Sequence, residues 1–127
     1  MQSEAKKTIL VVDDEAGILE YLKNILSRHN YKVVVTSKGK DAFDLALSKK
    51  PDLIILDIVM PDLSGGEVAS LLSKNPKTSN IPILFLTGIM NKSEARTMER
   101  CGKHHIMAKP VIVDELILMI ERLIPPD

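Results

Sequence analysis

The sequence predicts an α/β fold in which a five-stranded parallel sheet carries helices on both faces. Short runs of consecutive apolar residues, typical of strands covered on both sides, alternate with stretches of helical periodicity. This regular alternation favours parallel strands joined by crossover helices. The 127 residues, of which 45% are hydrophobic, are enough to bury the core of one domain. We therefore expect one domain over residues 1–127, with its core at about 8–124.

Five apolar runs are the predicted strands. Each is short, rich in aliphatic or β-branched residues, and shows little alternation between polar and apolar positions, as expected of strands buried on both faces. They are TILVV (8–12), KVVVT (32–36), LIILD (53–57), PILFLT (82–87) and IMA (106–108).

The stretches that follow these runs are predicted as helices. Residues 15–29 have a clear apolar stripe, with Asp14 as a possible N-cap and Asn30 at the expected end. Residues 39–49 and 65–74 have similar stripes, whereas SEARTMERCG (93–102) has few apolar points. The strongest stripe is in VDELILMIERLI (113–124), which ends before two prolines.

The composition excludes several classes of protein. Seventeen basic residues balance seventeen acidic ones, so nothing favours a nucleic-acid or anionic-membrane partner. The single cysteine, Cys101, permits no internal disulfide and is expected to be a small buried hydrophobe. No apolar run is long enough for a signal-peptide core or a membrane helix. We expect a cytoplasmic domain without direct contact to membrane or nucleic acid.

Chemically active residues stand at the carboxyl ends of the predicted strands, where sites of such sheets form. They are Asp13, Asp14, Asp57, Thr87 and Lys109. Three acids at one edge repel each other, and a cation would offset this repulsion. A donor set of oxygens suits Mg²⁺, and the ammonium and hydroxyl groups would hold an anion.

Asp57 ends an otherwise apolar strand. A carboxylate in this position can accept a phosphoryl group as an acyl phosphate. The rigid strand would aim the acid at both a metal and a phosphoryl donor.

The motifs VVDDE, LIILDIVMPDLSG, FLTG and AKP, in this order and spacing, resemble the receiver domain of bacterial two-component response regulators. The resemblance extends over about residues 8–124. It implies a flavodoxin-like three-layer (βα)5 sandwich with strand order 2-1-3-4-5. It also implies two-component phosphorelay signalling, in which a histidine kinase, a phosphotransfer protein or a small phosphodonor supplies the phosphoryl group.

The same resemblance assigns metal and acceptor roles by position. Asp57 would be the phosphoacceptor. Asp14, Asp57 and the backbone carbonyl of Val59 would bind Mg²⁺ directly, and Asp13 would act through a metal-bound water. Thr87 would hydrogen-bond to the phosphoryl group.

The remaining implications concern the last strand. Lys109 would pair with Asp57 or its phosphate, and the Lys109–Pro110 peptide would be cis. The chain departs from the family at Ile106, where an aromatic residue is common, at Val111, where Phe is common, and in the loop GKHH. We therefore expect output through the face of the fourth helix, last strand and last helix, without an aromatic switch.

Two further positions border the phosphoryl group in the family, and here both are apolar. They are Val59 and Ile89. Neither offers a polar group to orient a hydrolytic water, so slow self-dephosphorylation is expected. His104 and His105 are interpreted as loop residues rather than metal ligands.

These features are compatible with three functional classes. The first is a phosphorylation-switched signalling module, which catalyses only its own phosphorylation and dephosphorylation. The second is an enzyme, either a flavin-binding protein or an aspartyl phosphatase. Asp13 and Asp14 would repel the phosphate of a flavin, and the D-x-D pair of an aspartyl phosphatase is missing from LDIVM. The third is a pseudo-receiver that never takes phosphate. The complete set of acids and the lysine favours the first, whether the chain stands alone or precedes an output domain.

Overall fold

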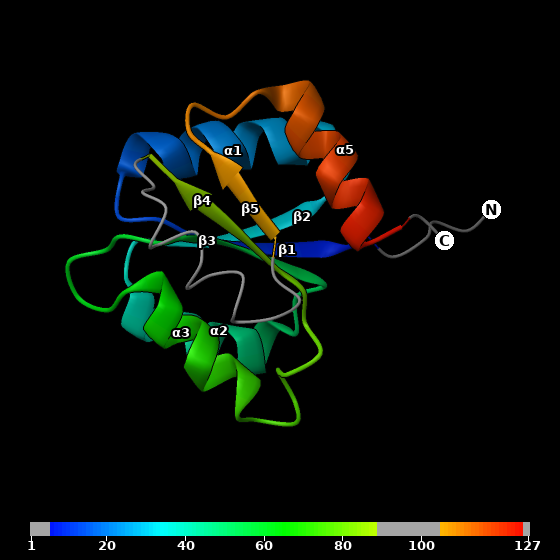
Figure 1. Cartoon of the computed structure of the whole chain (residues 1–127). Coiled ribbons are helices and arrows are strands. Elements are labelled where there is room, and N and C mark those ends of the chain that lie inside the picture. Colours follow the sequence, from blue (N-terminus) through cyan, green and yellow to red (C-terminus); the bar gives the residue numbers. More distant parts are fainter. Residues whose placement is uncertain (1–5, 89–104, 126–127) are drawn as a thin grey trace.

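The computed structural model describes residues 6–88 and 105–125. Within them, five strands form a single parallel sheet in the order β2-β1-β3-β4-β5 (Figure 1). The strands are β1 (Thr8–Val12), β2 (Lys32–Thr36), β3 (Leu53–Asp57), β4 (Ile83–Thr87) and β5 (His105–Ala108). The predicted fold class and strand order are therefore confirmed.

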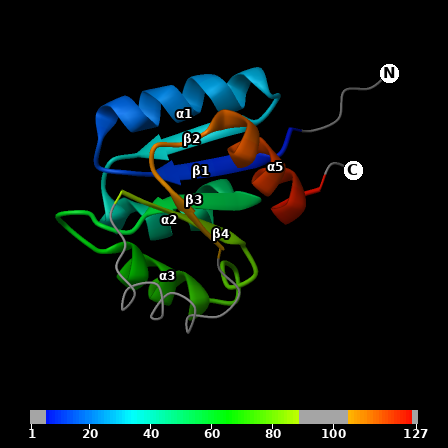
Figure 2. The same ribbon diagram turned by 45° about the horizontal axis from the view of Figure 1, so that its top comes forward.

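Four helices cover the two faces of this sheet in the described residues. They are α1 (Ala16–Arg28), α2 (Gly39–Lys49), α3 (Gly65–Ser73) and α5 (Val113–Leu123). Helices α1 and α5 lie on one face, and α2 and α3 lie on the other (Figures 1 and 2). The helix predicted in SEARTMERCG lies outside the described residues. None of the described helices is both long and apolar enough to cross a bilayer.

The core consists of two apolar layers separated by the sheet. Alternate side chains of each central strand point to opposite faces. Leu10, Ile54 and Phe85 thus join α2 and α3 in one layer, whereas Ile9 and Ile55 join α1 and α5 in the other. All residues of β3 and β4 are buried. The rigid centre of the sheet therefore ends on the two buried polar residues Asp57 and Thr87.

Local signals explain where several helices begin and end. Asn30 follows α1 with a φ of 70°, which agrees with its predicted position at the helix end. Ser64 and Glu67 form a reciprocal capping box at the start of α3. The prediction that Asp14 caps α1 is wrong: Glu15 occupies the N-cap position and its side chain makes no capping hydrogen bond.

Candidate functional site

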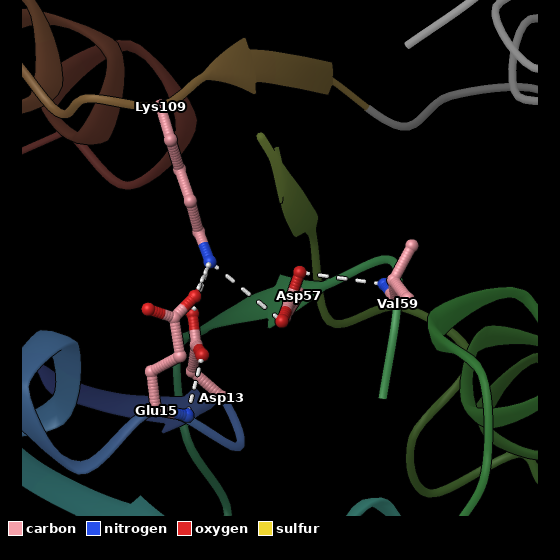
Figure 3. A network of polar contacts seen from close by, with 5 residues as sticks. All are labelled: Asp13, Glu15, Asp57, Val59 and Lys109. Carbon is pink, nitrogen blue, oxygen red and sulfur yellow. Dashed lines mark hydrogen bonds and ion pairs between the residues drawn. The ribbon is translucent and has the colours of Figure 1, made fainter. Parts of the chain in front are cut away.

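The predicted site residues converge at the carboxyl edge of the sheet. Asp13 and Asp14 follow β1, Asp57 ends β3, Thr87 ends β4 and Lys109 follows β5. Strands β1, β3, β4 and β5 are successive neighbours in the sheet, so residues far apart in sequence meet there. Figure 3 shows the Lys109 side chain pointing from the β5 side toward the acids of β1 and β3.

Three of these acids form a compact oxygen cluster. One carboxylate oxygen from each of Asp13, Asp14 and Asp57 lies within 4.8 Å of the others. Asp13 and Asp57 are buried, whereas Asp14 is exposed. The cluster therefore has a buried side formed by the sheet and an open side toward solvent.

The Lys109 ammonium is the cation seen at this cluster in the described residues. Its Nζ lies 2.9 Å from Asp13 Oδ2, 3.2 Å from Glu15 Oε1 and 3.6 Å from Asp57 Oδ2 (Figure 3). Burial alone would lower the pKa of Lys109, but the close contact with Asp13 and the charges of Asp13 and Asp57 outweigh this effect and raise the pKa. Lys109 therefore stays charged.

Asp57 lies in an environment that opposes its negative charge. Burial, followed by the charge of Asp13, raises its pKa from 3.8 to about 6, while the charge of Lys109 and the hydrogen bond from Val59 act in the opposite direction. The Val59 N–H donates to Asp57 Oδ1 over 3.3 Å. The Lys109 ammonium and the Val59 N–H therefore offset only part of the effect that burial and Asp13 have on the pKa of Asp57.

The loop after Asp57 is held close to the strand end. The Gly65 N–H donates to the Ile58 carbonyl over 2.8 Å, which closes the loop. A Cβ atom at Gly65 would lie only 2.5 Å from the Asp57 carbonyl oxygen and 2.9 Å from Ile58 Cα. Glycine is thus required here because the start of α3 touches the backbone at the end of β3.

The ends of β4 and β5 are joined to each other beside the site. Lys109 N–H donates to the Thr87 carbonyl over 2.8 Å, and Thr87 is paired with Ala108 in the sheet. The Thr87 residue is almost fully buried. The Lys109–Pro110 peptide is cis, which confirms that prediction.

Some predicted residues lie apart from the polar cluster or outside the described residues. Ile106 lies in β5 and packs, partly buried, against the apolar layer on the α2 and α3 side. Val59 is 67% exposed next to Asp57. His105 is exposed at the start of β5, which begins one residue before the predicted strand. Ile89, Cys101 and His104 lie outside the described residues.

Glu15 was not predicted as a site residue, although it contacts Lys109 directly. Its N–H donates to Asp13 Oδ1 over 2.9 Å, and its carboxylate reaches the ammonium from the solvent side. The sequence signal that could have identified Glu15 is its position directly after Asp13 and Asp14 in VVDDE. Sequence alone associates it with the start of the following helix.

The residues present fit a hard divalent cation. Asp13 Oδ2 is buried and accepts no hydrogen bond of regular geometry in the described residues, so its negative charge is balanced there only by the ion pair with Lys109. Asp14 and Asp57 supply further oxygens to the same cluster. Carboxylate oxygens without nitrogen or sulfur ligands are the donors that Mg²⁺ prefers.

Comparison with known proteins gives a consistent result. The family model described as the response regulator receiver domain matches residues 9–121. PilH of Pseudomonas aeruginosa is 32% identical over 91% of this chain and 96% of its own length. The crystal structure of the chemotaxis protein CheY4 of Vibrio cholerae matches with a TM-score of 0.88, 25% identity, and coverage of 94% of this chain and 100% of that chain.

Longer proteins match over only part of their length. Histidine kinase P4 of Formosa agariphila is 34% identical over 94% of this chain but only 9% of its own length. The chain spans between 9% and 49% of several such curated relatives.

Proposed function

The chain belongs to the response regulator receiver domain family, a signalling family of two-component phosphorelays, and from this premise we propose that Asp57 is its phosphoacceptor. The observation that carries this proposal is the position of Asp57. It is a buried acid at the end of the central strand β3, with the Lys109 ammonium 3.6 Å away and two further acids beside it. Asp13, Asp14, Thr87 and Lys109 support the reaction in distinct roles.

Receiver domains bind Mg²⁺ at an acidic site, and the acidic cluster of this chain is suited to the same ion. Asp14, Asp57 and the Val59 carbonyl are the proposed direct ligands, and Asp13 is proposed to act through a metal-bound water. When bound, Mg²⁺ supplies positive charge to the transferring phosphoryl oxygens.

The proposed reaction is transfer of one phosphoryl group. A carboxylate oxygen of Asp57 attacks phosphorus, and a new P–O bond forms while the P–N bond of a phosphohistidine breaks. The electron pair of that bond stays on the imidazole nitrogen, and a proton on the other ring nitrogen of the phosphohistidine makes the leaving group a neutral imidazole. With acetyl phosphate the broken bond is P–O and the leaving group is acetate. The product is an aspartyl phosphate in both cases.

The side chains around Asp57 have complementary roles in this proposal. Lys109 stays charged and attracts the anionic phosphoryl group. Thr87 ends the strand next to β3 and would donate its hydroxyl to a phosphoryl oxygen. The apolar layers beneath the site keep Asp57 in place, because β3 is buried throughout. The chain thus positions the acceptor and stabilises negative charge.

The partners follow from the reaction class. We propose a histidine kinase or phosphotransfer protein as the donor, acting in the cytoplasm, and a target protein or output domain as the receiver of the signal. The proposed output surface includes β5 and α5, where Ile106 takes the position of the usual aromatic switch residue. Because Ile106 packs against the core, it would transmit a shift of Thr87 by repacking, without an aromatic hydroxyl group that is buried or exposed.

The decisive experiment is labelling by acetyl phosphate followed by intact-protein mass spectrometry. In the presence of Mg²⁺, one phosphoryl group should be added to the wild type, and Asp57→Asn should abolish the addition because the amide oxygen is a poor nucleophile. EDTA should abolish it as well. Asp44→Asn, on the exposed side of α2, removes the same charge and should be labelled normally. Labelling of the Asp57→Asn variant at another residue would overturn the assignment.

A further inference from the structure

Lys109 is shared unequally among three carboxylates. Its Nζ is closest to Asp13 and Glu15, at 2.9 and 3.2 Å, and farther from Asp57, at 3.6 Å. Asp13 and Glu15 both belong to the segment that joins β1 to α1. Figure 3 shows the ammonium directed at these two acids rather than midway to Asp57. In this arrangement the β1–α1 segment holds the cation that the acceptor requires.

Glu15 differs from the other two acids in its surroundings. Its side chain is 62% exposed, whereas the Lys109 side chain is only 12% exposed. Its backbone is fixed because its N–H donates to Asp13 Oδ1. Glu15 does not belong to the cluster of Asp13, Asp14 and Asp57 whose oxygens lie within 4.8 Å of each other. It therefore contacts the lysine without belonging to the candidate metal site.

A phosphoryl group on Asp57 would compete for the same ammonium. The group is anionic and lies on the Asp57 side, so Lys109 must approach it to form a charge-assisted hydrogen bond. Movement in that direction lengthens the contact with Glu15 on the other side. The free energy of the Glu15 contact is thus present before phosphorylation and is reduced after it, which disfavours the phosphorylated state.

We propose that Glu15 is a positioning residue that holds Lys109 on the β1–α1 side and so lowers the affinity of the site for a phosphoryl group. The proposal rests on the phosphoacceptor role of Asp57. An ion pair that is open to solvent on one side contributes modestly, so removal of the contact should tighten phosphoryl-analogue binding by about two- to fivefold. Glu15 thereby sets how readily the domain is switched on.

The test uses the complete chain with saturating Mg²⁺ and beryllium fluoride, which forms a tetrahedral anionic adduct with a carboxylate. Glu15→Gln keeps the shape of the side chain and removes its charge. It should bind beryllium fluoride about two- to fivefold more tightly than the wild type, with Mg²⁺ affinity measured separately. Glu20→Gln, at an exposed position of α1, removes the same charge and should bind like the wild type.

A double-mutant cycle shows whether the effect passes through Lys109. In a Lys109→Met background, Glu15→Gln should give no gain. A gain that persists there, or equal affinity of wild type and Glu15→Gln, would overturn the proposal.

If the Lys109→Met protein binds beryllium fluoride too weakly for measurement, Glu15→Asp tests the contact with Lys109 instead. This variant keeps the charge, but its side chain is one methylene shorter. It should show part of the gain, and wild-type affinity in this variant would count against the contact. Failure of the wild type itself to bind beryllium fluoride, or binding that survives Asp57→Asn, would instead contradict the proposed acceptor.

Discussion

The position of Asp57 lowers the folding stability of the domain but suits the proposed phosphoacceptor role. Only 5% of the residue is exposed, and Asp13 lies close enough to raise its pKa through like-charge repulsion in addition to burial. The charge of Lys109 and the Val59 N–H compensate in part. An amide at this position would avoid the cost of a buried charge but could not act as the nucleophile.

This environment makes stability depend on pH in a defined direction. The pKa of Asp57 is raised from 3.8 to about 6 in the folded protein. Between these values the folded state holds more protons than the unfolded chain, so the free energy of unfolding falls as pH rises. In EDTA, wild type should lose about 3 kcal/mol of unfolding free energy relative to Asp57→Asn across this window, with a constant difference above it. Urea unfolding at a series of pH values measures this difference.

Asp44→Asn is the control for the loss of one carboxylate, since it lies on the exposed side of α2. A pH dependence that Asp44→Asn shares with Asp57→Asn would reflect the loss of a carboxylate in general and not the burial of Asp57. A difference between wild type and Asp57→Asn that stays level over the same pH range would contradict the raised pKa.

At the scale of secondary-structure elements, two contacts connect the loop after Asp57 to neighbouring helices. Gly65 begins α3 directly against the end of β3. Asp62, in the same loop, accepts hydrogen bonds from the N–H groups of Gly39 and Lys40 at 3.2 and 3.1 Å. It thereby caps α2, whose own N-cap residue makes no side-chain capping bond. The hydrogen bond from Lys40, together with that from Gly39, lowers the pKa of Asp62.

The contact at Gly65 predicts a large effect for a small substitution. In Gly65→Ala, the new methyl group would meet the backbone of Asp57 and Ile58 at distances below 3.0 Å, so the strand end or the helix must shift. We expect a loss of about 1–3 kcal/mol in the free energy of unfolding. Gly17→Ala is the matched control, because nothing lies within 4 Å of its Cβ position in α1. It should be neutral or stabilise by up to about 1 kcal/mol.

Urea unfolding of both variants measures the difference. The labelling rate of Gly65→Ala by acetyl phosphate should fall as well, since the displaced backbone carries the proposed acceptor. Equal stability of the two alanine variants would show that α3 adjusts without disturbing β3.

At the scale of the whole molecule, the sheet could be predicted because a strand that is buried on both faces consists of consecutive apolar residues, and such a run is visible in the sequence itself. The run LIILD corresponds to β3 without any shift, and IMA differs from β5 by one residue. The meeting of Asp13, Asp57 and Lys109 followed from the rule that parallel strands end at one edge. The alternation of strands and helices was therefore sufficient to predict this part of the site.

The contacts of Glu15 and Asp62 could not be predicted in the same way. Both are exposed acids next to turns, where periodicity carries no information. Their partners, Lys109 and the start of α2, are distant in sequence, so the contact depends on loop paths and side-chain rotamers. The sequence around Asp62 gives no sign that this residue caps a helix that precedes it in the chain.

If the acidic cluster binds Mg²⁺ as proposed, the ion should raise the free energy of unfolding of the whole domain. Its proposed ligands come from the end of β1 and the end of β3, which are adjacent only in the folded sheet. An ion that binds the folded state and not the unfolded chain raises the free energy of unfolding by RT ln(1 + [Mg²⁺]/Kd), or about 2.7 kcal/mol at a hundredfold excess over Kd. The urea midpoint of the wild type at about pH 7.5, above the raised pKa of Asp57, should therefore rise with Mg²⁺ while the slope of unfolding stays constant.

Asp57→Asn should be more stable than wild type in EDTA but gain much less from Mg²⁺, because it lacks both the repulsion and one anionic ligand. Choline chloride at matched ionic strength controls for general screening of charges. A midpoint that rises equally in both proteins, or equally with choline chloride, would show that the ion acts elsewhere than at this cluster. A rise confined to the wild type with Mg²⁺ would connect the acidic edge of the sheet to the stability of the whole domain, since β1 and β3 lie at its centre.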